Sequence, residues 1–526
     1  MADENSAYVS PFPADPVIVV ITKPADAAAT PVPLADMDMS ADADATAPPV
    51  PGSQTGGGSA NFSALVSAAG GAVSSLFGDD GSSAAAPAAP GEAVAPAAPA
   101  TDQNAAKGLN LDSYFLVSAP LQALDGLLAQ LQQQPDVAGA YIAPPLQPPI
   151  WDLTDLPDAP APAAGTPDFS AHQAYLEAAP AGVDARFAWT KAGGNGAGVQ
   201  IIDIEGGWRT THEDLQANHG GVVGGVPLTG QGWVDHGTAV LGVFSGTGTG
   251  VTGICPGATV RMVSHNGNEA SRAIKQAADL LGEGDIMLLE MHRPGPAANF
   301  QLNATQAGFI AVEWWPDVFV AIQYAVNKGI VVIEAAGNGA QNLDDPIYNT
   351  PAPGFPAGWS NPFARGARDS GAILVGAGSP PPNTHGKTWA ADRARMDFSN
   401  YGSAVDVQGW GREVSSTGYG DLQGGADQDK WYTDHFSGTS SASPVVTGVV
   451  GCIQGARKAA GLAPLNSAAV RDVLRTTGSP QQDGVYGPAT QRIGNRPDLK
   501  QILPMILSVT YNANDGVVTA GSSAAV

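Results

Sequence analysis

Short apolar runs alternate with helix-like segments through the middle of the chain. The runs that indicate buried strands lie at residues 199–205, 258–264, 285–291, 329–336, 371–378 and 404–410. The segments that indicate helices lie at residues 236–244, 269–281 and 318–328, and a longer one opens at 437. Buried strands that alternate with helices are typical of a parallel sheet covered on both faces. We therefore predict a doubly wound α/β domain with a mainly parallel sheet over residues 168–507.

The rest of the chain divides into four parts. Residues 1–107 are a low-complexity mixture of Ala, Pro, Asp, Gly and Ser, which predicts disorder because little apolar area can be buried to offset the entropy of ordering. Residues 108–148 contain a strand-like run, a helix-like segment and a second strand-like run, so they predict a small β-α-β unit. Residues 149–167, rich in Pro and Asp, predict an exposed linker, and residues 508–526 predict a polar tail.

Composition and charge exclude several classes of protein. The 526 residues carry a formal net charge of -25, which favours solubility and opposes binding to nucleic acid. Cys255 and Cys452 each lie among small apolar residues, so we expect buried free thiols, with a disulfide as the alternative. The acidic N-terminus lacks the basic start of a secretory signal, and no run of about 20 apolar residues could span a bilayer. Cytoplasmic residence and secretion by a non-classical route both stay open.

The segment Ser-Gly-Thr-Ser-Ser-Ala-Ser-Pro, residues 437–444, is the strongest chemical signal. Its small residues allow a sharp turn before a long helix, where backbone N–H groups and the helix dipole favour an adjacent oxyanion. Ser440 stands at that point. Taken alone, it is either a nucleophile or an ordinary helix cap.

Two further residues could activate the Ser440 hydroxyl. Asp203 ends the apolar run Val-Gln-Ile-Ile-Asp, where a buried carboxylate needs a hydrogen-bonded or cationic partner. His236 opens the run His-Gly-Thr-Ala-Val-Leu-Gly at a predicted helix start. A hydroxyl nucleophile needs a base with a pKa near neutrality, and that base needs a carboxylate to hold its tautomer. Each residue alone is also explained as a cap, but the set predicts a catalytic triad.

The three segments together resemble the subtilisin (subtilase) family, in which the triad follows the chain order Asp, His, Ser. The resemblance covers roughly residues 168–505 and implies a serine endopeptidase that works through an acyl-enzyme. It implies that Ser440 attacks the peptide carbonyl, that His236 accepts and returns the proton, and that Asp203 orients His236.

The resemblance also implies the other residues of the site. Asn338, in Ala-Ala-Gly-Asn-Gly, matches the family's asparagine that donates to the oxyanion beside the N–H of Ser440. Residues expected to form the pocket before the scissile bond are Leu289, Glu290, Met291, Ala336 and Gly337.

The pocket departs from the family pattern. Many subtilisins have a Ser-Leu-Gly-Gly run where this chain has Leu-Glu-Met-His-Arg at 289–293, so the sequence does not predict the preferred peptide. Glu290 and Glu334 raise the hypothesis of a negative pocket for basic residues. Exposed or salt-bridged carboxylates are the alternative.

We expect no cofactor to be required for catalysis and assign no metal ligand. Asp214, in His-Glu-Asp-Leu, resembles a calcium ligand of the family, but the segment between His236 and Cys255 carries no carboxylate to complete such a site. A structural calcium ion therefore has little support here. The run Gly248–Gly253 fits a dinucleotide-binding pattern, but it lies between a helix and a strand, the reverse of the required order, and predicts only a turn.

The predicted unit at 108–148 resembles the inhibitory prosegment of subtilases. In that interpretation the enzyme is made as an autoinhibited precursor, and the unit's C-terminal stretch lies in the substrate groove as an added strand. A folded appendage without an inhibitory role is the alternative. We expect a monomer that acts on protein or peptide substrates.

Other functions fit the sequence less well. A catalytically silent, peptide-binding relative would lack a triad member. A sedolisin-type peptidase would have Glu at the position of His236 and Asp at that of Asn338. A lipase-like hydrolase would need Gly-x-Ser-x-Gly and a different order of the triad.

Overall fold

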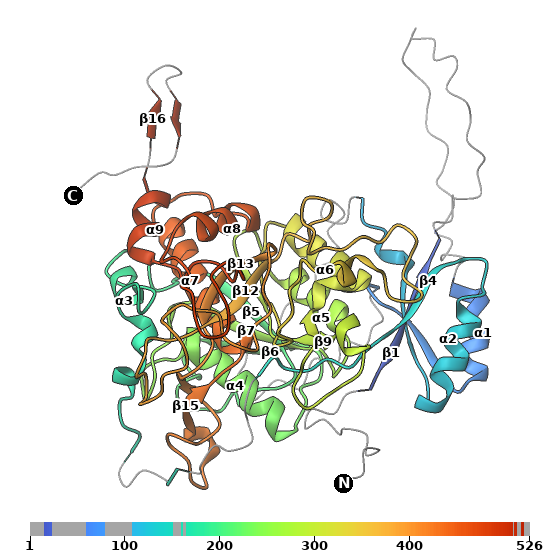
Figure 1. The fold of residues 1–526 in the computed structure, drawn as a ribbon, viewed down its shortest axis with the longest axis horizontal. Helices are drawn as coiled ribbons and strands as arrows, with labels where there is room; N and C mark the ends of the chain where they lie inside the picture. Colours follow the sequence, from blue (N-terminus) through green and yellow to red (C-terminus); the bar gives the residue numbers. More distant parts are fainter. Residues whose placement is uncertain are drawn as a thin grey trace, which may run out of the picture.

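The computed structural model describes residues 15–23, 59–78, 108–150, 159–160, 165–508, 510–512 and 517–519. Figure 1 shows a large α/β domain with a smaller N-terminal unit, in blue and cyan, packed against one side of it. Among the described helices, none is both long and apolar enough to cross a membrane.

The centre of the large domain is a seven-stranded sheet in which every strand pair is parallel. In spatial order its strands are β13 (Val405–Trp410), β12 (Ile373–Gly378), β11 (Val331–Ala335), β8 (Ile286–Leu289), β5 (Gln200–Glu205), β7 (Thr259–Ser264) and β6 (His219–Gly224). The predicted doubly wound α/β fold is confirmed. The edge strand β6 was not predicted, since its Gly-rich sequence has no apolar run.

Helices cover both faces of this sheet (Figure 1). On one face lie α4 (Gln231–Ser245) and α7 (Thr439–Ala459), and on the other lie α5 (Ala270–Leu280) and α6 (Pro316–Asn327). Strand residues alternate between the two layers: Ile201 packs in the core on the α4–α7 side, and Ile202 packs on the α5–α6 side. Helix α4 begins at Gln231, so His236 lies within the helix and not at its predicted start.

Smaller elements complete the large domain. They are α3 (Ala185–Ala188), α8 (Ser467–Thr476), α9 (Leu499–Ile506), the pair β9 (His292–Pro294) and β10 (Phe309–Ala311), and the pair β14 (Val414–Thr417) and β15 (Tyr432–Phe436). In the predicted tail, β16 (Thr510–Asn512) and β17 (Val517–Thr519) pair with each other and stand apart from the domain (Figure 1). Cys255 and Cys452 are buried free thiols, as predicted.

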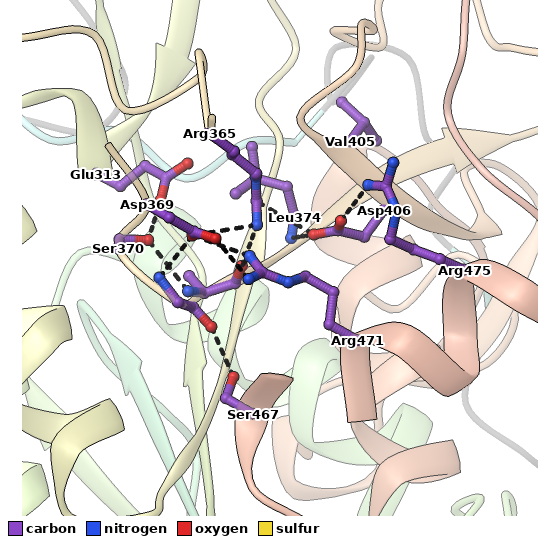
Figure 2. A network of polar contacts seen from close by, with 12 residues as sticks. Glu313, Arg365, Asp369, Ser370, Leu374, Val405, Asp406, Ser467, Arg471 and Arg475 are labelled. Atoms are coloured by element: carbon purple, nitrogen blue, oxygen red, sulfur yellow. Dashed lines mark hydrogen bonds and ion pairs between the residues drawn. The ribbon is translucent and has the colours of Figure 1, made fainter. Parts of the chain in front are cut away.

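A buried polar network ties α8 to the edge of the sheet (Figure 2). Arg475 contacts Asp406 of β13 at 2.5 Å, and Arg365 contacts the other oxygen of Asp406 at 3.1 Å. Arg471 donates to Asp369 at 2.6 Å. Burial raises the pKa of Asp406, and the two arginines beside it oppose that rise. Because the buried carboxylate of Asp406 and the half-buried one of Asp369 both have cationic partners, the network has a structural role.

The N-terminal unit is a four-stranded antiparallel sheet with two helices on one face. Its strands, in spatial order, are β2 (Ala72–Ser75), β3 (Tyr114–Ser118), β1 (Val17–Thr22) and β4 (Val137–Ala143), and its helices are α1 (Ser59–Ala68) and α2 (Leu124–Leu131).

The prediction that all of residues 1–107 are disordered is wrong at β1, α1 and β2. The run Val-Ile-Val-Val-Ile-Thr of β1 lies between β3 and β4 and completes the sheet, so the strands of the predicted β-α-β unit are not neighbours. Average composition conceals such a short apolar run. The remainder of 1–107 lies outside the described residues.

Both faces of the N-terminal sheet are buried. Ile18 and Val20 pack against α1 and α2, whereas Val19 and Ile21 belong to the core that includes α5 and α6 of the large domain. The Tyr141 hydroxyl donates to Asp317 at the start of α6 at 2.7 Å. The second sheet face is therefore covered only while the unit is docked on the large domain.

Candidate active site

Several polar side chains meet at the carboxyl ends of the central strands, where parallel α/β sheets form their sites. Glu205 is the last residue of β5, and Glu290 directly follows β8. His236 comes from α4, and Ser440 is the second residue of α7. All four residues are fully buried.

The carboxylate beside His236 belongs to Glu205. Its Oε1 lies 2.6 Å from His236 Nδ1. Asp203 instead accepts a hydrogen bond from Trp208 Nε1 at 2.7 Å. The prediction that Asp203 orients His236 is therefore corrected: the structure pairs the imidazole with the carboxylate two residues further along the strand.

The alternation of side chains along β5 explains why the partner of His236 lies two residues after the predicted one. Asp203 and Glu205 point to the same face as Ile201, toward α4 and α7, because strand side chains repeat with a period of two. Glu205 stands at the end of the strand, whereas Asp203 lies one pleat deeper. The rule that sites form at carboxyl strand ends was the signal that could have selected Glu205.

Burial keeps the site close to electrical neutrality. It lowers the pKa of His236 to about 3 and raises the pKa of Glu205 well above the usual range. The pKa of Asp203 is also raised, mainly by burial and to a smaller extent by repulsion from Glu205. Burial thus opposes charge on both Glu205 and His236, a close pair whose atoms approach to 2.6 Å.

Glu290 is a second carboxyl beside the imidazole. Glu205, His236 and Glu290 each present an atom within 4.8 Å of the others. The Ser443 hydroxyl donates to Glu290 Oε1. Burial and then Glu205 raise the pKa of Glu290, while the hydroxyls of Ser443 and Ser440 oppose the rise. Burial thus opposes a negative charge on Glu290 next to the serine, which disfavours a basic side chain at this place.

The Ser440 hydroxyl is not hydrogen-bonded to His236 in this closed state. Its Oγ and His236 Nε2 make no well-formed hydrogen bond to any residue that the structure describes, which leaves both free to meet a substrate. Gly438, which precedes α7, has φ 107°, a conformation that favours glycine. An added Cβ there would lie 2.1 Å from the oxygen of Pro149.

Asn338 is held beside this helix start. Its Oδ1 accepts from the backbone N–H of Thr439 at 2.9 Å and from the Thr439 hydroxyl at 3.0 Å. Its Nδ2 donates to Gln306 Oε1 at 3.1 Å. The side-chain amide of Asn338 is therefore held in place through its oxygen, and its Nδ2 faces Gln306.

Replacing Asn338 by alanine tests its predicted contribution to the oxyanion site. We expect kcat to fall by about 10² to 10³, since one positioned donor to the oxyanion is lost. KM should change little, because the donor matters most in the transition state. Steady-state kinetics on a peptide substrate measures both. An unchanged kcat would contradict the assignment.

The other predicted pocket residues divide between the two sheet faces. Leu289, Met291 and Ala336 belong to the core on the α5–α6 side, so their side chains turn away from Ser440. Gly337 has φ 93°, and its N–H donates to Thr439 Oγ1 at 3.2 Å. Of the five residues predicted for the pocket, Gly337 and Glu290 lie next to the serine segment.

Glu334 also lies away from the serine. It follows Ile333 in β11 and faces the α5–α6 side, where its Oε1 accepts from the backbone N–H of Glu313 at 3.0 Å. Burial and Glu313 raise its pKa, and Arg365 opposes the rise. The hypothesis of a negative pocket formed by Glu290 and Glu334 is therefore wrong.

The chain's own residues 146–150 fill the cleft and are all buried. Gln147 pairs with His292 of β9 through two backbone hydrogen bonds of 3.1 and 3.0 Å, so the segment extends the β9–β10 sheet. Gln306 Nε2 donates to the carbonyl of Pro148 at 3.0 Å. The N–H of Ser440 donates to the carbonyl of Pro149 at 3.3 Å.

The residues present do not fit a calcium ion at Asp214. One carboxylate oxygen accepts from Thr249 N at 2.5 Å, and the other accepts from Gly250 N at 2.7 Å, Val251 N at 2.9 Å and Tyr432 Oη at 2.8 Å. The glycine-rich turn thus surrounds the carboxylate with donors, and a cation has no free ligand oxygen there.

A second histidine cluster lies outside the site. Both nitrogens of His385 face backbone carbonyls, those of Asp434 and His172, each at 3.1 Å. Only a doubly protonated ring donates to both. Glu413 accepts from His435 Nδ1 at 2.9 Å. Burial would raise the pKa of Glu413, but the imidazoles of His385, 3.8 Å away, and of the hydrogen-bonded His435 lower it to about 2.

This cluster predicts a loss of stability in acid. A carboxylate whose pKa is lowered on folding stabilises the protein above its unfolded pKa of about 4.3, and that contribution is lost as pH falls toward 2. We expect the melting temperature of the Ser440→Ala chain to fall over this range. The same chain with Glu413→Gln should show a shallower fall, and equal slopes would contradict the assignment.

Comparison with known proteins identifies the family of this chain. The family model described as the subtilase family matches residues 194–495, more than half of the chain. Thermitase of Thermoactinomyces vulgaris is 28% identical over 52% of this chain and 80% of its own length, and subtilisin BL of Lederbergia lenta is 26% identical over 47% and 76%. The solved structure of the prenylagaramide maturation protease PagA has a TM-score of 0.41 at 19% identity, covering 61% of this chain and 96% of that one. The chain belongs to the subtilase family and is a subtilisin-like serine endopeptidase.

Proposed function

We propose that this chain is an autoinhibited precursor of a serine endopeptidase with a Glu205–His236–Ser440 triad. In the open enzyme, Ser440 attacks the peptide carbonyl while His236 takes its proton and later gives it to the leaving amine. Glu205 holds the Nδ1 proton of His236 and stabilises the imidazolium. Asn338 and the N–H of Ser440 bind the oxyanion.

The observation that carries the proposal is the hydrogen bond from the N–H of Ser440 to the carbonyl of Pro149. A peptide carbonyl in that position occupies the place of a substrate carbonyl. Because the occupying residues join directly to β4 of the docked N-terminal unit, that unit would block the cleft until the chain is cut. This supports an inhibitory role over that of a folded appendage.

The neutral site also supports an inactive precursor. Burial lowers the pKa of His236 to about 3 and makes it a weak base, so the uncut chain accepts the Ser440 proton slowly near neutrality, which still permits one slow cut within the chain itself. Removal of residues 146–150 would admit water, reduce the burial that lowers the pKa of His236 and let Glu205 ionise beside it. Clearing the cleft would therefore free the substrate site and restore the base at the same time.

A fluorophosphonate probe tests the proposal on intact and processed protein. We expect processed wild-type chain to label and to hydrolyse casein, and uncut chain to do neither. Asn338→Ala, which slows self-cleavage but keeps Ser440, traps the uncut form, and the same variant after processing is the comparison, since both then carry the same loss of the oxyanion donor. Full labelling and casein hydrolysis by uncut chain would overturn the autoinhibited precursor.

A further inference from the structure

Three contacts fix the register of the segment in the cleft. Gln147 pairs with the backbone of His292, the side chain of Gln306 reaches the carbonyl of Pro148, and the N–H of Ser440 reaches that of Pro149. A carbonyl whose oxygen accepts from the N–H of the nucleophile has its carbon beside the nucleophilic oxygen. The carbonyl marked by the nucleophile's own N–H is therefore that of Pro149, and the N–H of Ile150 on the other side of the bond donates to the carbonyl of Pro148 at 2.8 Å.

The segment carries prolines at the two positions before that bond. Of residues 147–149, only Gln147 has a backbone N–H, and that group is paired with His292. The prolines bring no further N–H into the buried cleft, where an unpaired donor costs about 1–3 kcal/mol. Their fixed φ also reduces the entropy lost when a peptide is ordered in the groove.

The floor of the site near Gly337 is closed by a fixed side chain. An added Cβ at Gly337 would lie 2.8 Å from Asn400 Nδ2. Asn400 cannot easily withdraw, since its Nδ2 donates to the carbonyl of Ala336 at 2.7 Å and to that of Phe309 at 2.8 Å. The space on this side of Gly337 is thus already filled.

We infer that the enzyme cuts its own chain between Pro149 and Ile150 and, once open, prefers substrates with proline directly before the scissile bond. This inference rests on the proposed function. Ser440 Oγ bonds to the carbonyl carbon of Pro149 as its proton passes to His236. The bond to the Ile150 nitrogen breaks as His236 gives that nitrogen the proton. Water then hydrolyses the acyl-enzyme, releasing the Pro149 carboxylate and restoring Ser440.

The first test identifies the new N-terminus of the processed full chain by mass spectrometry. We expect Ile150 in the wild type and no cut in Ser440→Ala. Pro149→Ala should slow processing by about 10-fold, the order that one small pocket contact contributes to selectivity. Pro160→Ala, a matched control at an exposed position beyond the cleft, should process at the wild-type rate.

The second test compares two blocked peptides on processed enzyme, Leu-Gln-Pro-Pro-Ile-Trp and Leu-Gln-Pro-Ala-Ile-Trp. We expect kcat/KM about 10-fold higher for the first, with cleavage before Ile. A different new N-terminus, or equal cleavage of the alanine peptide, overturns the inference. If fluorophosphonate labelling and casein hydrolysis persist in that case, the proposed function survives. If Ser440→Ala processes normally, both fail.

Discussion

Alanine at Ser440 is expected to lower kcat on the order of 10⁶-fold, because the nucleophile is lost and only binding and oxyanion contacts remain to stabilise the transition state. The Ser440 hydroxyl makes no well-formed hydrogen bond to the described residues, so its removal should not destabilise the fold. Casein hydrolysis and fluorophosphonate labelling measure the loss. The variant chain should stay uncut.

Ser441→Ala is the matched control for this change. Its hydroxyl donates to the carbonyls of Trp410 at 2.8 Å and Gly438 at 3.1 Å, which is a structural role. Removing it should reduce stability by about 1 kcal/mol and leave labelling in place. Labelling that persists in Ser440→Ala and disappears in Ser441→Ala would contradict the assignment of the nucleophile.

Replacing Glu205 by glutamine is expected to lower kcat by about 10⁴-fold. The amide has nearly the shape of the carboxyl group but cannot stabilise the imidazolium, and it favours the wrong tautomer of His236. The control is Asp203→Asn, which keeps an oxygen to accept from Trp208 and should change kcat by less than about 10-fold. A larger loss in Asp203→Asn than in Glu205→Gln would refute the pairing seen in the structure.

Much of the large domain could be predicted because its strands are buried on both faces. Such strands carry unbroken apolar runs, as in Val331–Ala335, and those runs are readable locally. Strand β6, rich in glycine, and strand β1, set within a low-complexity region, gave no comparable signal. Their places depend on pairing with strands distant in the sequence, which no local pattern encodes.

The site was less predictable than the fold. The residues Ser440, His236 and Asn338 stand in recognisable segments, and the structure places them together around the carboxyl ends of the strands. The acid partner could not be selected by motif, because Asp203 and Glu205 share one face of β5 and only their depth in the sheet distinguishes them. The direction in which the Glu290 side chain points and the register of residues 146–150 depend on packing between segments that are distant in the sequence. Local sequence patterns do not encode that packing.

The most direct test of the Glu205–His236 pair is the proton NMR spectrum of the Ser440→Ala chain. A proton that His236 Nδ1 donates to the Glu205 oxygen 2.6 Å away would resonate far downfield of the backbone amides. We predict that this signal is present in the Ser440→Ala chain, persists when Asp203→Asn is added and disappears when Glu205→Gln is added. Its loss in Asp203→Asn together with its survival in Glu205→Gln would contradict the account.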